Sequence, residues 1–456
     1  MVLKLYYLSA SPPSRAVLLG IRNLGLEVDV ITVNLFKGEH LKPEFKNLNP
    51  VHQVPVIDDN GFILSESRAI LGYLVNKFQP GSTLYPTDAQ RRAIIDQRMY
   101  YDINVFERNA AAIRPIFREP NPPRPSDIIK AKIRESMETL DGFVSKSLWF
   151  AGDLPTIADL SILSNVAQIK ACGYELSRHQ NLNRWYGICK SLPGFEENER
   201  GAIKLGEVYQ SRMGNPFETY LCFSVACKYS HSLVMSRKLP MVLYHNYISP
   251  PSRMAVLAVR NLALDIDIRN LDIYKGDQNT HEYLQINPLH QVPCLVHENF
   301  VLTESRAIIM YLASLTDSPL YPTSDLQKRA LVDSRLFFDA TNSFVAVKNF
   351  ARPVLRSGVK KVPSAAREDI KILLNTLDSF LDKSEWFAGD EMTIADLAIL
   401  ASVGTIKCWG VNFKEFPKLN GWFEKCRNLP GFSENQEGSQ ALAEKLSKLL
   451  EEPLWK

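Results

Sequence analysis

Hydrophobic and polar side chains alternate weakly along residues 2–7, which predicts a short strand at the start of the chain. SPPSR then ends that strand, and apolar residues three and four apart in AVLLGIRNLGL predict a helix capped near Gly25. VDVITVNL is rich in β-branched residues and predicts a second strand. VPVIDD and GFILSE predict a hairpin around Asn60-Gly61, and SRAILGYLVNKF predicts the next helix. The order β-α-β and then β-β-α is typical of a thioredoxin-like α/β domain of roughly eighty residues.

The pattern changes from about residue 89 to residue 204, where apolar residues recur at helical spacing and predict an all-helical domain. Within it, Thr156 and Asp159 have the spacing of a capping box, and Thr393 and Asp396 repeat that spacing later. We therefore expect these residues to start a helix rather than to perform chemistry.

Most of the chain is duplicated in order. LYYLSASPPSR, which starts at Leu5, returns as LYHNYISPPSR from Leu243, and NPVHQVPV and LSESRAI return as NPLHQVPC and LTESRAI at the same offset. The fold prediction is an α/β domain and an all-α domain, occurring twice. The predicted boundaries are 1–81 (α/β), 88–204 (helical), 205–240 (linker), 241–319 (α/β) and 324–450 (helical).

Composition excludes several classes of protein. The 456 residues are 45% hydrophobic and 23% charged, as in globular proteins, and the net charge of +3 is spread along the chain, so we expect no nucleic-acid or membrane partner. The apolar stretch Tyr220–Cys227 is too short to span a bilayer. The seven cysteines lack CxxC pairs and zinc-site spacing, which indicates reduced thiols, a cytoplasmic location and no metal.

The SPPxR loop, GEHLKPEF, NPxHxVP, ESRAI and TIAD occur together in this order, largely in both units. In this combination the chain resembles cytosolic glutathione transferases of the insect delta and epsilon classes, with epsilon closer. The resemblance implies an enzyme that conjugates the thiolate of glutathione, its co-substrate, to small hydrophobic electrophiles.

Such chemistry needs a group that favours the thiolate, because an unperturbed thiol has a pKa of about 8.5 and is mostly protonated at neutral pH. A hydroxyl at a helix N-terminus suits the task, and lowering the pKa by two units takes about 2.7 kcal/mol. Ser11 and Ser249 occupy this position and match the family's catalytic serine. The alternative is that each is only an N-cap. Ser9 is a second candidate, although its counterpart in the repeat is Tyr247.

The resemblance also implies a set of glutathione contacts. The proline bond is cis in the family and exposes the preceding backbone, the Glu-Ser pair meets the γ-glutamyl end, and the histidines meet the glycine carboxylate. The alternatives are an ordinary strand-edge proline, plain helix capping and structural histidines, and for the arginines a subunit interface or a solvated surface. The residues are His40, His52, Val54, Pro55, Glu66, Ser67 and Arg68, then Gln278, His290, Val292, Pro293, Glu304, Ser305 and Arg306.

The two units differ at one of these positions, because His40 is replaced by the uncharged Gln278 and GEHLKPEF by GDQNTHEY. We therefore expect the second unit to bind glutathione more weakly or to be inactive. For the electrophile, the resemblance points to the helical domain, although the aromatic candidates could equally be core residues. These candidates are Phe106, Arg114, Phe117, Phe344 and Arg352.

Two further hypotheses stay open. One is a scaffold or ligand-binding protein that keeps the fold with little turnover, at least in the second unit. The other is that two adjacent genes have been read as one, because MVLYHNY at Met241 resembles MVLKLYY at Met1. Family members are usually dimers, so the two units could pair within one chain or the chain could form a homodimer. The sequence does not identify the physiological electrophile.

Overall fold

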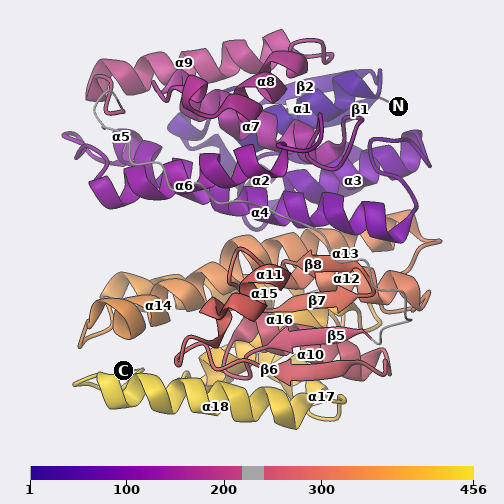
Figure 1. Ribbon diagram of the computed structural model, residues 1–456, viewed down its shortest axis with the longest axis vertical. Coiled ribbons are helices and arrows are strands. Elements are labelled where there is room, and N and C mark those ends of the chain that lie inside the picture. The colour runs from indigo at the N-terminus through magenta and orange to yellow at the C-terminus, as the bar shows by residue number, and fades with distance from the viewer. Residues whose placement is uncertain (1, 218–240, 456) are drawn as a thin grey trace. The chain divides into compact units, whose positions relative to one another are not determined.

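The computed structural model describes residues 2–217 and 241–455 and divides the chain into two units, Met1–His231 and Ser232–Lys456 (Figure 1). Each unit contains one four-stranded sheet followed by a set of helices. No helix in the described part of the chain combines the length and the apolar character needed to cross a membrane.

The sheet of the first unit has the strand order β2-β1-β3-β4, in which β1 runs parallel to β2 and antiparallel to β3. The prediction of a thioredoxin-like domain is therefore confirmed. Leu5 on β1 and Ile57 on β3 are fully buried, whereas Phe45 packs near Val56 on the opposite face. The elements are β1 (Leu3–Tyr7), α1 (Pro12–Asn23), β2 (Val28–Thr32), α2 (Pro43–Leu48), β3 (Val56–Asp59), β4 (Phe62–Ser65) and α3 (Ser67–Phe78).

Turns and caps follow the local sequence. Asn60 and Gly61 have φ values of 56° and 90°, as expected for the two-residue turn between β3 and β4. Gly25 follows the end of α1 with φ 65°, a conformation that costs glycine little. Both predictions are confirmed.

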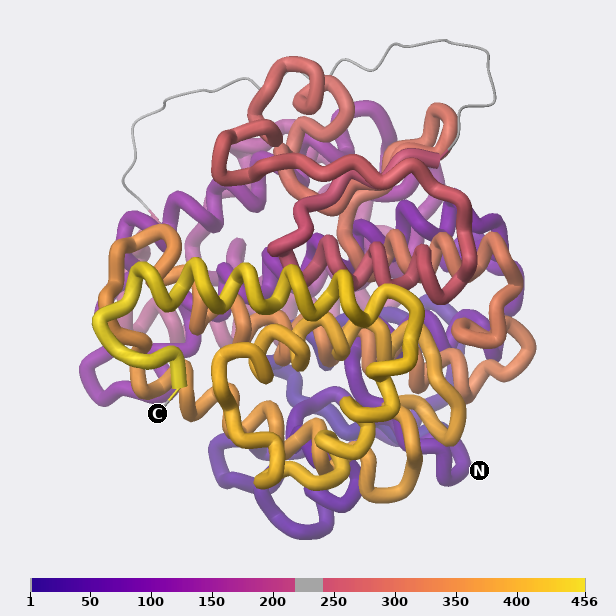
Figure 2. Tube along the Cα trace, turned by 90° about the horizontal axis from the view of Figure 1, so that it is seen from below, coloured from indigo at the N-terminus to yellow at the C-terminus, as the bar shows by residue number. Residues whose placement is uncertain are grey.

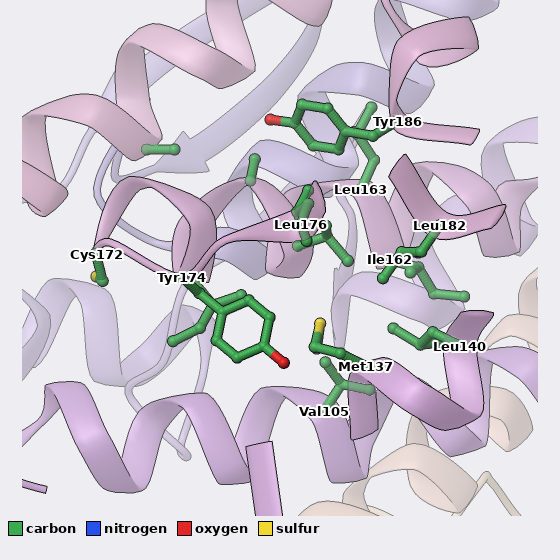
Figure 3. Packing of buried hydrophobic residues seen from close by; sticks show 14 of the residues in the cluster. Val105, Met137, Leu140, Ile162, Leu163, Cys172, Tyr174, Leu176, Leu182 and Tyr186 are labelled. Carbon is green, nitrogen blue, oxygen red and sulfur yellow. The ribbon is translucent and has the colours of Figure 1, made fainter. Parts of the chain in front are cut away.

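The helical domain of the first unit packs around α7, which is buried along nearly its whole length (Figure 3). Asp159 lies in the first turn of this helix, and its carboxylate accepts hydrogen bonds from the Thr156 N–H at 2.8 Å and the Trp185 indole at 3.0 Å. The predicted capping box is present here and at Thr393 and Asp396. The helices are α4 (Ala89–Ile113), α5 (Pro115–Arg118), α6 (Asp127–Phe143), α7 (Ile157–Ala171), α8 (Gln180–Cys189) and α9 (Phe195–Met213).

The second unit repeats this order, with the sheet β6-β5-β7-β8, and its last helix packs beside α10 and α16 (Figure 2). Its α/β elements are β5 (Val242–His245), α10 (Pro250–Asn261), β6 (Asp267–Asn270), α11 (His281–Ile286), β7 (Cys294–His297), β8 (Phe300–Thr303) and α12 (Ser305–Leu315). Its helical elements are α13 (Leu326–Phe338), α14 (Phe344–Ser357), α15 (Ser364–Phe380), α16 (Ile394–Cys408), α17 (Pro417–Cys426) and α18 (Phe432–Leu449).

One long helix differs between the units. Four steps along the chain separate Asp102 from Phe106, whereas five separate their counterparts Asp339 and Phe344. The extra residue is absorbed as a π-helical turn, Asp339–Ser343, between α13 and α14. The turn keeps the aspartate buried at the same place although the helix contains one residue more.

The predicted linker starts too early. Helix α9 continues to Met213, past the expected boundary at residue 204, because Leu205, Tyr209 and Met213 recur at four-residue spacing on one buried face. Residues 205–213 therefore belong to the helical domain. Residues 218–240 of the predicted linker lie outside the described residues.

Candidate functional site

Ser11 lies between β1 and α1 as the N-cap of the helix, and it is partly accessible to solvent. Among the described residues, its hydroxyl oxygen accepts one long hydrogen bond, 3.4 Å from the Ser14 N–H, so the hydroxyl hydrogen remains able to donate. The first turn of α1 contains no acidic residue, and hence no side-chain carboxylate there offsets the positive end of the helix dipole. An anion beside Ser11 would be stabilised by both effects.

A buried cation supports the same loop. Arg15 is 1% exposed and donates to the carbonyl oxygen of Ser9 at 2.9 Å and to Asn198 Oδ1 at 3.0 Å. Its remaining bonds reach neutral acceptors on α7, and no carboxylate in the described ranges lies within ion-pair distance of it. Burial lowers the pKa of Arg15 to about 10, so the side chain stays charged at neutral pH. Its positive charge therefore lies close beneath the Ser11 loop.

The second unit builds the same loop. Ser249 is the N-cap of α10, makes no side-chain capping bond, and precedes a first turn without acidic residues. Arg253 is buried and donates to the Ile248 carbonyl oxygen at 3.2 Å and to Asn435 Oδ1 at 3.1 Å. Ser11 and Ser249 thus have equivalent surroundings in the two units.

The Val54-Pro55 and Val292-Pro293 peptide bonds are both cis, as the resemblance implied. Val54 precedes the hydrogen-bonded ladder of β3, which begins at Val56. The backbone of Val54 therefore lies before the part of β3 that is paired with its neighbouring strands. An extended peptide ligand could pair with it as an additional strand would.

Glu66 and Ser67 lie at the start of α3, and Glu66 has φ 71°. Glu304 has φ 67° at the same place before α12. Left-handed backbone is costly for glutamate, so its occurrence in both units shows that the surrounding structure holds this position in place. Burial raises the pKa of Glu304 to about 7, with Arg306 opposing the shift.

Arg68 and Arg306 are not solvated, and that alternative is wrong. Arg68 is 4% exposed and binds Asp102 of α4 at 2.6 Å, while Arg306 forms the equivalent buried pair with Asp339. Asp102 also accepts from the hydroxyl of Ser161, at 2.7 Å. These arginines therefore connect the start of α3 or α12 to the helical domain, next to the Glu-Ser pair.

His40 and His52 come together, with ring centroids 6.1 Å apart. His40 Nδ1 is buried and has no hydrogen-bond partner among the described residues. In the second unit the Oε1 atom of Gln278 is orphaned in the same way, and His290 has φ 44° compared with 46° for His52. Within the described ranges, an unpartnered buried polar atom therefore occurs at the same position in both units, an Nδ1 that can donate in the first unit and an Oε1 that can only accept in the second.

The electrophile candidates are more scattered. Phe106 is half-buried, and the exposed Arg114 lies 5.6 Å from its ring centroid and pairs with Glu107 at 3.4 Å. Phe117 is 41% exposed and contacts Phe36, so the core alternative does not apply to it. In the second unit, Phe344 is half-buried beneath the Arg306 guanidinium, and Arg352 is exposed on α14.

Sequence reasoning missed several residues of this site. They are Arg15 and Arg253, the partners Asp102 and Asp339, and the aromatic residue Phe36. The two arginines could have been found, because PPSR is repeated in both units. The hydrogen-bond partners of these arginines could not have been found from the sequence, because they lie far from the arginines along the chain.

Comparisons with known proteins agree with this geometry. A family model described as "Glutathione S-transferase, N-terminal domain" matches residues 1–76 and 239–314, and the corresponding C-terminal domain model matches residues 341–430. Together these matches cover more than half of the chain.

Solved insect structures are similar to one unit at a time. A delta-class glutathione transferase of Nilaparvata lugens is 38% identical, with 46% of this chain and 100% of that chain covered and a TM-score of 0.45. An epsilon-class enzyme of Musca domestica is 31% identical, with 46% and 98% covered and a TM-score of 0.44. A glutathione transferase homologue from Drosophila mojavensis "with bound glutathione" has the same four values as the Musca enzyme.

Proposed function

The chain belongs to the glutathione S-transferase family as a tandem of two units, and on that premise we propose that it conjugates the sulfur of glutathione to small hydrophobic electrophiles. One observation carries the proposal, and it is made once in each unit. A serine hydroxyl that is able to donate lies at the N-terminus of a helix whose first turn has no acidic residue, and a buried arginine holds the same loop. The relative with bound glutathione supports glutathione as the co-substrate.

In this mechanism the Ser11 hydroxyl donates to the glutathione sulfur. The hydrogen bond, the helix dipole and the charge of Arg15 all favour the thiolate over the thiol, and the thiolate is the attacking species. The thiolate then displaces a leaving group from the electrophile or adds to it. Ser249 and Arg253 would have the same roles in the second unit.

The remaining contacts position the tripeptide. The Val54 backbone pairs with the cysteinyl unit, Glu66 accepts from the γ-glutamyl ammonium, and Ser67 donates to its carboxylate. His40 and His52 donate to the glycine carboxylate, which would satisfy the orphaned Nδ1 of His40. Arg68 is paired with Asp102, so we assign it to positioning Glu66 and Ser67 rather than to direct contact.

The second unit should bind glutathione more weakly. A carboxylate can accept from Nδ1 of His40, whereas it cannot donate to the buried Oε1 atom of Gln278, which can only accept. The alternative of a scaffold with little turnover applies most directly to this unit.

The test is an assay of the full-length chain with glutathione and a chromogenic aryl halide, together with calorimetric titration of glutathione. We expect conjugation above the uncatalysed rate and two classes of glutathione site, the weaker in the second unit. If the protein binds glutathione but does not accelerate the reaction, the scaffold alternative replaces the enzyme.

The pKa of Glu304 gives a pH prediction. Its carboxylate form should bind the γ-glutamyl ammonium, and with a pKa of about 7 the ionised fraction falls as the pH is lowered. We expect S-methylglutathione, which has no titrating thiol, to bind the second unit about five- to tenfold more weakly at pH 6 than at pH 7.5.

The measurement is a calorimetric titration of a chain carrying Glu66→Gln, in which the first site is weakened. Glu304→Gln on this background should bind weakly at both pH values. A pH dependence that survives Glu304→Gln would assign the titration to another group.

A further inference from the structure

In each unit, the segment that follows the second strand meets the helical domain, and we call this contact region the junction. The segment contains Phe36 after β2 in the first unit and Tyr274 after β6 in the second, and the two junctions differ. In the first unit this junction is aromatic and apolar, because the rings of Phe36 and Phe117 lie 5.1 Å apart and are 65% and 41% exposed. Val208 of α9 is also exposed.

In the second unit the same positions carry different chemistry. Phe36 is replaced by Tyr274, Phe117 by Leu355 and Val208 by Lys445. Lys445 Nζ lies 3.0 Å from the centroid of the Tyr274 ring. A cation over an aromatic face therefore links the α/β domain of this unit to α18.

This contact lies near the Ser249 loop. A Cβ atom on Gly438 of α18 would meet the carbonyl oxygen of Tyr247 at 2.1 Å, so α18 touches the loop two residues before Ser249. Lys445 is seven residues after Gly438 and thus on the same face, about 10 Å further along the helix. A small molecule between Ser249 and Lys445 would span that distance.

The charge at this junction is more positive in the second unit. The cation Lys445 replaces Val208, and the uncharged Val345 replaces Glu107, which pairs with Arg114 in the first unit. Arg356 lies close enough to Tyr274 for its charge to oppose the rise that burial causes in the pKa of that tyrosine. Neither Lys445 nor the exposed Arg356 has a carboxylate within ion-pair distance in residues 2–217 and 241–455.

The acidic groups near this junction are already engaged. Asp272 caps the local turn by accepting from the Tyr274 N–H at 3.0 Å, and it pairs with Lys275. Glu444 accepts from Gln440 on the exposed side of α18. They do not cancel the two cations by direct pairing.

We propose that the second unit binds an aromatic carboxylate at this junction, with its carboxylate on Lys445 and Arg356 and its ring against Tyr274 and Tyr247, whereas the first unit prefers the uncharged analogue at Phe36 and Phe117. The inference rests on the proposed function in one respect: if the second unit transfers glutathione, this carboxylate is its electrophile. Tyr247 is 48% exposed and available for such a contact.

The chemistry follows from the donors present. The ammonium and the guanidinium can each donate charge-assisted hydrogen bonds to a carboxylate, and phenol rings pack against an aromatic body. The methyl ester of the same acid keeps the shape but has no negative charge. The acid and its ester therefore form a matched pair of probes.

The test is calorimetric binding of 4-chloro-3-nitrobenzoate and of its methyl ester to the full-length protein without glutathione. We expect Lys445→Val to weaken binding of the acid about tenfold and to leave the ester unchanged. Lys445→Arg should still bind the acid. Val208→Lys should create a second binding site for the acid, in the first unit. Higher salt should weaken binding of the acid and leave binding of the ester unchanged.

The inference is overturned if Lys445→Val leaves acid binding unchanged, or if acid and ester weaken together, which would mean that the substitution has only loosened the junction. Thermal unfolding of each variant identifies any loss of fold, and Lys445→Gln then provides a second neutral replacement. Since the titration contains no glutathione, failure of conjugation would leave this result intact and would concern only the proposed function.

Discussion

Ser11→Ala is expected to reduce glutathione conjugation by the first unit at pH 7, by at most about 25-fold. Without the hydroxyl the sulfur loses a charge-assisted hydrogen bond, and its pKa returns from about 6.5 toward 8.5. A complete return would lower the thiolate fraction from about three quarters to about 3%, and the helix dipole and the charge of Arg15 retain part of the stabilisation. Initial rates with a chromogenic aryl halide measure the loss.

The pH profile distinguishes this role from a structural one. If Ser11 acts on the thiol, the variant should recover most of its rate above pH 9, where glutathione ionises without help. Ser9→Ala is the matched control and should change the rate less than twofold, as its hydroxyl is not at the N-cap position. Equal losses in both variants, or a loss that high pH does not reverse, would contradict the assignment.

Ser249→Ala extends the comparison to the second unit. If Ser11→Ala removes most of the turnover of the whole chain, the first unit is the working enzyme. If Ser11→Ala and Ser249→Ala each leave about half, both sites are active.

Asp102→Ala should destabilise the first unit by about 3–5 kcal/mol. Asp102 is fully buried and accepts from Arg68 at 2.6 Å, from Ser161 at 2.7 Å and from Asn165 at 2.8 Å. Its removal leaves the guanidinium of Arg68 buried and without its counter-charge, which costs more than the pair contributed. The midpoint and slope of urea unfolding give the free energy.

The chain offers two controls. Glu197→Gln breaks the half-exposed Arg22–Glu197 pair and should cost less than about 1 kcal/mol. Asp339→Ala removes the equivalent buried acid in the second unit and should affect the unfolding of that unit. If Asp102→Ala lowered the free energy of unfolding no more than Glu197→Gln does, the buried Arg68–Asp102 pair would not have the stabilising role that we assign to it.

Features with short-range causes were readable in the sequence. The Asn60-Gly61 turn, the capping boxes at Thr156 and Thr393, and Ser11 as an N-cap each depend on residues within a few positions. The second copy of the SPPSR loop also showed which serine to favour, since Ser9 is replaced by Tyr247. The α/β and helical order, the family and the candidate serine were predictable for these reasons.

Features that depend on packing were not. Arg68 finds Asp102 thirty-four positions away and Arg15 finds Asn198 still further along, and no local pattern links such pairs. The extra residue before Phe344 could equally have become a loop, but the packing of α13 and α14 around the buried Asp339 absorbed it as a π-helical turn. The sequence by itself determined the two units, their elements and the serine at the start of each first helix, because local hydrogen bonding and side-chain periodicity act over a few residues. Only the tertiary structure decided which charges are buried, which partners hold the serine loop and which side chains meet at each junction, because distant residues come into contact only when the helices pack on the sheet.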